Sequence, residues 1–252
     1  MNNKCLSVLL LVFMTISVQG QVNIRDSSIH LTILNTTYRG LLTGGDMADR
    51  FGLSHTIGAD IGHKFPNNFY IKGGFGLLLG GPVREDSMLR FLEAAPRLFI
   101  NDNGELTGVR LLQQGYVIPV GIGKIFSVIP GQNPNCGLFV ELGGQFIQHK
   151  IQARISEGTM VALSSQNKKG YDRLTNGFGI RESVGYKYFS NSGFLNFSIG
   201  LDISQNFTQS RRSINIDTGV SDTTNRLDHL VGISASWILL IYNKAPNTIY
   251  FN

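Results

Sequence analysis

The feature that most constrains this chain is a set of eight segments in which apolar and polar residues alternate every second position. A period of two is typical of a β-strand with one apolar and one polar face. Segment 53–65 shows the pattern best, because Leu53 and Ile57 fall on one face while Asp60 and Lys64 fall on the other. The other segments expected to be strands are 28–38, 69–79, 116–126, 137–151, 177–189, 194–206 and 227–242.

The connections between these segments alternate strictly between short and long. The short connections are 66–68, 127–136 and 190–193, and the long ones are 39–52, 80–115, 152–176 and 207–226. Lipid accepts only structures that satisfy every backbone polar group internally, which means helices or closed barrels. An even number of strands, short periplasmic turns and longer outer loops indicate a bacterial outer-membrane barrel. The sequence therefore predicts an all-β, eight-stranded antiparallel up-and-down transmembrane β-barrel with its long loops extracellular.

The two ends of the chain are expected to differ from the barrel. Residues 1–20 combine a basic Lys4 with an apolar run and small residues before Gln21, which is typical of a cleaved signal peptide. Residues 21–252 then form the outer-membrane barrel, with a short periplasmic tail after the last strand. Loss of Lys4 with the signal peptide lowers the formal net charge from +5 to +4. This small excess of positive charge is not clustered, so it does not favour a nucleic-acid partner.

Charged residues are expected on the inward faces of several strands. The interior of an eight-stranded barrel is only wide enough for side chains to fill, and buried charges must be paired. We therefore expect a salt-bridged plug, with an ion-conducting pore as the alternative. Glu182 departs from the pattern because it points toward lipid, which indicates an interfacial position, a bulge or a partner. The expected lumen charge network consists of Asp60, Lys64, Lys72, Glu141, Arg181, Lys187, Asp202 and Asp228.

Nucleophilic catalysis would require a Ser or Cys brought together with a His base and an orienting carboxylate. Ser54 and His55, like Asp228 and His229, are adjacent, so on a strand they point to opposite faces and cannot form a dyad. Segment 232–236 lacks the final glycine of a nucleophile elbow. No phosphate loop, metal-ligand cluster or dinucleotide fingerprint is present in the sequence. We expect no catalytic residues, no cofactor, no metal and no small-molecule substrate.

The long loops and the turns carry two further sets of candidate residues. Segment 84–95 is rich in helix formers and is expected to be a short amphipathic helix that ends at Pro96. Basic and aromatic residues of two loops are expected to contact a partner or lipopolysaccharide, unless these are ordinary solvated loops; they are Lys168, Lys169, Tyr171, Arg173, Arg211 and Arg212. A periplasmic aromatic girdle is expected from Phe65, Phe69, Tyr70, Tyr188, Phe189 and Phe194.

Several stretches resemble a family of small outer-membrane β-barrels from the Bacteroidota. They are DMADRFG (46–52), QHKI (148–151), KKGYDRLTNG (168–177), FTQSRR (207–212) and RLDHLVGISASWILLIY (226–242). The chain is similar to accessory barrels of outer-membrane protein assembly or of type IX secretion and gliding machines. This resemblance implies no enzymatic activity, and it implies outer-membrane lipid, other outer-membrane proteins and lipoproteins as partners. The expected function is that of a non-catalytic scaffold or accessory subunit. The alternatives are a free-standing, adhesin-like surface barrel and a lipid-modifying enzyme.

Overall fold

The computed structural model describes residues 28, 30–129, 133–164, 166–190 and 195–241. The expected signal peptide and C-terminal tail lie outside these residues. Among the described residues, no helix has the length and apolar character needed to cross a membrane.

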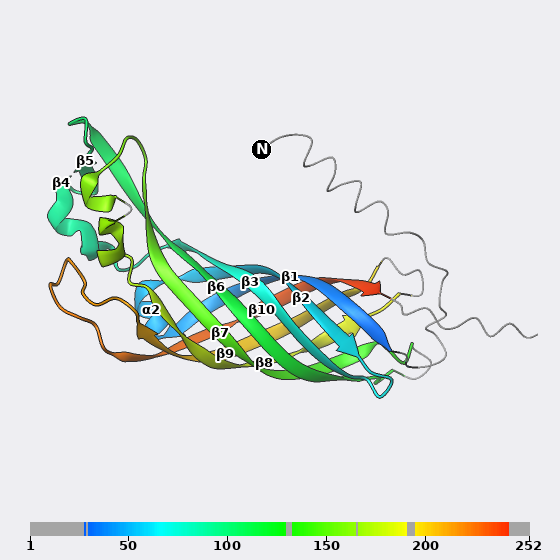
Figure 1. Cartoon of the computed structure of the whole chain (residues 1–252). Helices are drawn as coiled ribbons and strands as arrows, with labels where there is room; N and C mark the ends of the chain where they lie inside the picture. Colours follow the sequence, from blue (N-terminus) through cyan, green and yellow to red (C-terminus); the bar gives the residue numbers. More distant parts are fainter. Residues whose placement is uncertain (1–27, 29, 130–132, 165, 191–194, 242–252) are drawn as a thin grey trace, which may run out of the picture.

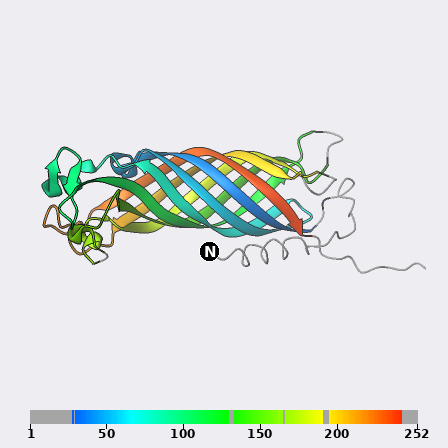
Figure 2. The same ribbon diagram turned by 90° about the horizontal axis from the view of Figure 1, so that it is seen from above.

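Eight long strands form a closed ring (Figures 1 and 2). Their hydrogen-bonded order is β3-β2-β1-β10-β9-β8-β7-β6, and an additional antiparallel pairing of β3 with β6 joins the two edges. Closure leaves no free edge among these strands, which satisfies the backbone as lipid requires. The strands are β1 (Leu31–Gly45), β2 (Leu53–Lys64), β3 (Phe69–Pro82), β6 (Leu106–Phe126), β7 (Gly137–Ile155), β8 (Thr175–Tyr188), β9 (Phe197–Ser210) and β10 (Asn225–Ile241).

The short and long connections gather at opposite ends of the barrel, here named the turn end and the loop end. At the turn end, Asn68 adopts a left-handed φ of 64° and its N–H bonds to the carbonyl of Phe65 at 3.0 Å, closing the tight turn expected at 66–68. At the loop end lie the short helix α2 (Asp46–Arg50), the strands β4 (Glu93–Ala95) and β5 (Leu98–Ile100), and three 3₁₀ helices (Figure 1). The 3₁₀ helices are η1 (Asp86–Leu92), η2 (Val161–Leu163) and η3 (Asn167–Gly170). The predicted antiparallel up-and-down barrel is confirmed. The strict alternation of short and long connections is not, because β1 extends to Gly45 and leaves only 46–52 before β2, a connection shorter than 127–136 between β6 and β7.

The outside of the barrel is apolar and its inside is layered. Residues such as Ile57, Val120 and Ile233 are half or more exposed on the outer face, the reverse of a soluble protein and typical of a surface solvated by lipid. Inside, one apolar cluster that includes Leu78, Ile147 and Leu230 lies toward the loop end. A second apolar cluster lies toward the turn end and consists of Leu31, Ile33, Tyr70, Ile125, Cys136, Phe139, Phe189 and Ile238.

The first strand differs from its prediction in length and orientation. It runs to Gly45 rather than to residue 38, and Leu31 and Ile33 point inward, where the sequence pattern placed them on the apolar outer face. The reversal follows from the turn-end cluster, which buries both side chains inside the barrel. Polar Asn35 and Thr37 continue the same inward face.

The loop 80–115 also differs from its prediction. β6 begins at Leu106 rather than Tyr116, and β7 continues to Ile155, so this hairpin projects beyond the other strands at the loop end. The expected helix over 84–95 is instead the 3₁₀ helix η1 followed by β4. β4 pairs with β5, and β5 pairs with β6. This pairing holds residues 93–95 in an extended conformation, so the helix cannot continue through them.

The expected aromatic girdle is split between the two faces of the wall. Phe65 and Phe69 are exposed on the outside, as expected, whereas Tyr70 and Phe189 are buried in the turn-end cluster. Tyr188 is half-buried, and Phe194 lies outside the described residues. Tyr70 and Phe189 therefore fill the lumen and do not contact the membrane interface.

Candidate functional site

Five of the eight predicted lumen residues meet in one cluster between the two apolar clusters. Asp60, Lys72, Glu141, Arg181 and Asp202 lie on five different strands, and the acidic members are each less than 5% exposed. We call these five residues, together with Arg39, the lumen charge cluster.

The cluster is a connected chain of ion pairs. Arg181 Nε donates to Asp202 Oδ1 at 2.8 Å, and Lys72 Nζ lies 2.9 Å from Glu141 Oε2. Arg39 lies 3.7 Å from both Asp202 and Asp60. Each acid therefore has more than one base within reach, which is how buried charges are tolerated.

Arg39 is the member that sequence reasoning missed. It follows Asn35 and Thr37 on the inward face of β1, and this alternation would have identified it had the strand been continued past residue 38. Lys187 lies beside the cluster, with its Nζ 3.7 Å from the centre of the Tyr70 ring. An ammonium over an aromatic face gains a cation–π interaction.

The middle of the barrel is filled rather than open. A cavity of about 20 Å³ borders Arg39, Arg181 and Asp202. That volume holds roughly one water molecule. The lumen charge cluster lies between the apolar cluster at the loop end and the apolar cluster at the turn end. Together the three layers form a plug.

Lys64 and Asp228 lie apart from the cluster. Lys64 Nζ donates to Ser28 Oγ at 2.9 Å and to Asn135 Oδ1 at 2.8 Å near the turn end. Asp228 lies toward the loop end, where its Oδ2 contacts His149 Nε2 at 3.1 Å. These two predicted lumen residues are buried but serve separate contacts.

The contacts of Asp228 do not form a nucleophilic triad. Thr208 Oγ1 donates to Asp228 Oδ2 at 2.6 Å, and His149 contacts the same oxygen. A triad needs the imidazole between the nucleophile and the carboxylate, whereas here the carboxylate lies between the hydroxyl and the imidazole. His149 is also 1% exposed and packs edge-on against Phe51, so a substrate has no access to it.

The adjacent pairs considered for catalysis point apart. Ser54 is buried, and its hydroxyl donates to Gln113 Oε1 at 2.6 Å. His55 lies on the outer face, where its Nδ1 and the hydroxyl of Tyr38 form a 2.7 Å hydrogen bond. Among the described residues, no group of three His, Cys, Asp or Glu side chains is arranged to hold a metal ion.

The loops at the loop end are joined by a second ionic network, which we call the loop clamp. Its members come from α2, β10 and three long loops, and they are Arg50, Glu85, Arg173, Asp217, Asp222 and Arg226. Arg50 lies 3.2 Å from Glu85 and 3.5 Å from Asp222, and Arg173 holds Asp217 with two hydrogen bonds of 2.8 and 2.5 Å. Bidentate arginine–carboxylate pairs give geometric specificity, so the clamp fixes the loops relative to one another.

The predicted loop contacts divide into buried and exposed residues. Tyr171 and Arg173 are each 5% exposed and serve the loop packing. Arg212 holds Asp172 with hydrogen bonds of 2.7 and 2.6 Å, and these raise the pKa of its guanidinium. Lys168, Lys169 and Arg211 are exposed.

An apolar surface is exposed at the loop end, where β6 begins and the β6–β7 hairpin projects beyond the other strands. We call it the cap surface: Leu98, Ile100, Leu106 and Val161, which are 40–68% exposed. Ile100 opposes Leu106 across β5 and β6, and with Val161 it lines a groove of about 390 Å³. Leu106 is ten residues from Tyr116, which is about 30 Å along a strand. The cap surface is therefore well clear of the apolar belt.

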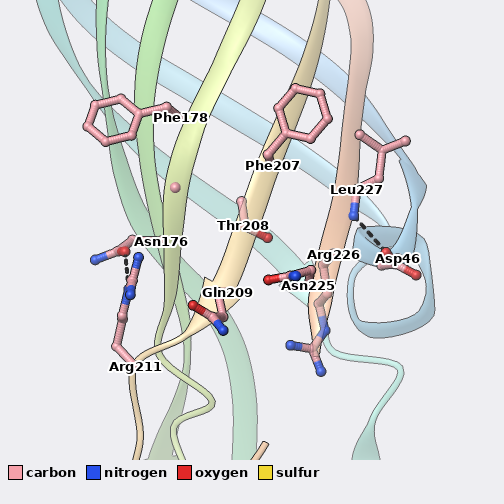
Figure 3. Close-up of a pocket in the computed structure, with 11 residues that line it drawn as sticks. Asp46, Asn176, Phe178, Phe207, Thr208, Gln209, Arg211, Asn225, Arg226 and Leu227 are labelled. Carbon is pink, nitrogen blue, oxygen red and sulfur yellow. Dashed lines mark hydrogen bonds between the residues drawn. The ribbon is translucent and has the colours of Figure 1, made fainter. Parts of the chain in front are cut away.

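A larger groove lies on the outside of β8, β9 and β10 where the belt ends (Figure 3). Its volume is about 650 Å³. Two rows of outward residues border it, and the strand register aligns them: Phe178, Phe207 and Leu227 in the row nearer the belt, and Asn176, Gln209 and Asn225 in the row nearer the loops. We call it the outer groove.

Glu182 occupies the outer face at the middle of β8. It is exposed, and its cross-strand neighbours Leu142 and Ile203 belong to the apolar belt. The register of β8 with both neighbours is continuous, so no bulge turns the side chain inward. A carboxylate at this depth costs free energy in lipid.

Comparisons with known proteins find similarity only at the level of solved structures. No protein-family model matches the chain, and no curated protein matches it. The attachment invasion locus protein Ail of Yersinia pestis aligns at 10% identity and a TM-score of 0.38, covering 84% of this chain and 99% of Ail. Ail in complex with the heparin analogue sucrose octasulfate gives 10% identity, a TM-score of 0.38 and coverages of 83% and 98%. The Neisserial surface protein A gives 11% identity, a TM-score of 0.36 and coverages of 82% and 96%. With similarities this low, the barrel assignment depends on the strand pairing described above.

Proposed function

We propose that this protein is a non-catalytic barrel of the bacterial outer membrane that holds a partner protein on its extracellular cap. The closed ring and the apolar outer face support the membrane location. The turn end then faces the periplasm and the loop end faces outward.

The observation that carries the proposal is the exposed cap surface on a rigid support. Loops usually expose polar residues, whereas contiguous exposed apolar residues mark interaction sites. Phe99 anchors β5 in the loop-end cluster from one side, while Leu98 and Ile100 point outward from the other. The pairing of β5 with β6 and the 3.0 Å hydrogen bond from the Val161 N–H to Asp102 Oδ1 hold this surface in place, which lowers the entropic cost of binding.

The finer proposal concerns the kind of complex. The resemblance to accessory barrels of the Bacteroidota favours an outer-membrane protein assembly complex or a type IX secretion or gliding machine. The expected partners are another outer-membrane protein or a lipoprotein. Among the described residues, the carboxylate of Asp228 lies between the Thr208 hydroxyl and the His149 imidazole, an order that does not suit nucleophilic catalysis.

The test is purification of the tagged protein from its native membrane in mild detergent, followed by mass spectrometry. Wild type should recover a stoichiometric partner, and the double variant Ile100→Glu with Val161→Glu should lose it, because buried unpaired charges oppose association. Ile214→Glu is the matched control, since Ile214 is 47% exposed on another loop. Recovery of wild type alone, or equal partner recovery by both variants, would contradict the proposal.

A second candidate is an adhesin-like surface barrel. It is favoured by the exposed Lys168 and Lys169 at η3, which have no carboxylate within ion-pair distance among the described side chains. Replacing both lysines by glutamine should abolish binding to acidic surfaces and leave partner recovery unchanged if this second function is the correct one. A lipid-modifying enzyme would instead change the lipid A and phospholipid profiles of a deletion strain.

A further inference from the structure

We propose that the outer groove binds the phosphorylated sugar headgroup of an outer-leaflet glycolipid of the lipid A class. The groove opens to the outside of the barrel, because the exposed side chains Phe178, Phe207 and Leu227 that border it belong to the outer faces of β8, β9 and β10 (Figure 3). It also lies where the outer face changes from apolar to polar, which is the depth of a lipid headgroup.

The row nearer the belt provides the acyl-chain contacts. Phe178 and Phe207 are 71% and 61% exposed and face each other across β8 and β9. The ring of Phe178 continues an aromatic series through Phe146, with ring centres 5.2 Å apart. Aromatic side chains of barrels gather at the membrane interface, so this row marks where acyl chains meet headgroups.

The row nearer the loops provides the headgroup contacts. Three carboxamides, Asn176, Gln209 and Asn225, lie side by side through the strand register. Carboxamides both donate and accept hydrogen bonds, which suits the hydroxyl groups of a sugar.

Arg211 provides the phosphate contact. Asn176 Oδ1 accepts a 2.6 Å hydrogen bond from Arg211 Nε, which aims the guanidinium over this row. Within the described part of the chain, Arg211 has no carboxylate partner, whereas neighbouring Arg212 is held by Asp172. A positioned guanidinium that lacks a protein anion matches phosphate geometry.

Asp46 favours a sugar over a simple phospholipid. Its carboxylate lines the β10 side of the groove, and one oxygen accepts the backbone N–H of Leu227 at 2.7 Å. Arg226 lines the same side, but its guanidinium is paired with Asp222. The carboxylate of Asp46 therefore disfavours a phosphate next to it, while a sugar hydroxyl can donate a hydrogen bond to it. The groove is therefore suited to a ligand with one phosphate near Arg211 and hydroxyl groups near Asp46. Its volume of about 650 Å³ suits such a headgroup.

The test is a titration of the purified, folded barrel in nonionic detergent with bisphosphorylated lipid A, dephosphorylated lipid A and phosphatidylglycerol, read by native mass spectrometry. We expect one lipid A per barrel and weaker binding of the other two lipids. Arg211→Ala should weaken lipid A binding about tenfold, the loss of one charge-assisted hydrogen bond. Arg110→Ala is the control, because Arg110 is an exposed arginine at the same end on β6.

Three outcomes would overturn the inference. Phosphatidylglycerol binding as tightly as lipid A would show a general anionic-lipid surface. Equal weakening by Arg211→Ala and Arg110→Ala would show an effect of net charge. Unchanged binding by Arg211→Ala, with heat-modifiable migration confirming the fold of each variant, would place the lipid elsewhere.

Discussion

Replacing Arg181 by methionine should strongly destabilise the barrel. Arg181 donates to Asp202 and lies 3.8 Å from Glu141, and both acids are buried in the lumen charge cluster. Removing one partner of a buried ion pair typically costs 3–5 kcal/mol, because a charge is left without compensation. Asp202 would keep Ser183 at 2.7 Å and Arg39 at 3.7 Å. We therefore expect the lower end of that range, about 3 kcal/mol.

The double variant Arg181→Met with Asp202→Leu distinguishes the loss of the ion pair itself from the cost of leaving one buried charge without a partner. It removes both charges and fills the space with apolar atoms, so its stability should lie within about 1 kcal/mol of wild type. Arg154→Met, an exposed arginine on β7, should change stability by less than about 0.5 kcal/mol.

The assay is urea unfolding in phospholipid vesicles. Trp237 is the only tryptophan in the sequence and lies half-exposed on the lipid-facing side of β10, so its fluorescence reports transfer out of the membrane. A cost below about 1 kcal/mol for Arg181→Met, or a double variant as unstable as the single one, would refute the idea of a buried ionic plug.

Three further predictions concern the lumen, the belt and the loops. In planar bilayers the purified barrel should show no steady conductance, because the interior cavity beside Arg39 holds about 20 Å³; stable ion-selective steps would contradict the plug. Glu182→Leu should stabilise the barrel in vesicles by about 1 kcal/mol, since a lipid-facing carboxylate costs less than the 2–4 kcal/mol of a base; an unchanged or lower stability would show that Glu182 is already compensated. Burial opposes ionisation of Asp222, but the Arg226 hydrogen bond and further contacts hold the pKa of its carboxyl below the ordinary value. Because this pKa is lower in the folded state, the stability it contributes is present above the unfolded pKa of about 4 and is lost as the pH falls through the folded value. The backbone N–H of Thr224 donates to Asp222 Oδ1 at 3.1 Å. Hydrogen exchange at Thr224, corrected for intrinsic rates, should therefore rise in acid in wild type, and the same rise in Asp222→Asn would exclude Asp222 as its origin.

Much of the wall could be predicted from the sequence because its period-two pattern is strong. On β2 and β9, inward Asp60 and Asp202 alternate with outward aliphatic residues. The pattern failed on β1, where Leu31 and Ile33 face inward. Apolar residues that seal a lumen look the same in sequence as apolar residues that face lipid.

The loop end could not be predicted, because its contacts join residues far apart in the chain. Arg173 and Glu85 are separated by 88 positions, and nothing in either local sequence pairs them. The outer groove likewise depends on register, since Asn176, Gln209 and Asn225 align only when three strands are paired. The basic loop residues were visible in the sequence, but which of them remain exposed is decided by partners such as Asp172 and Asp217.

The central claim, that the cap surface holds a partner, is tested most directly by photo-crosslinking in the native membrane. A photoreactive amino acid at Ile100 should give one discrete adduct with a second outer-membrane protein or lipoprotein, and the same probe at Ile214 should give none. No adduct at Ile100, or the same set of adducts from both positions, would contradict a docking role for the cap surface.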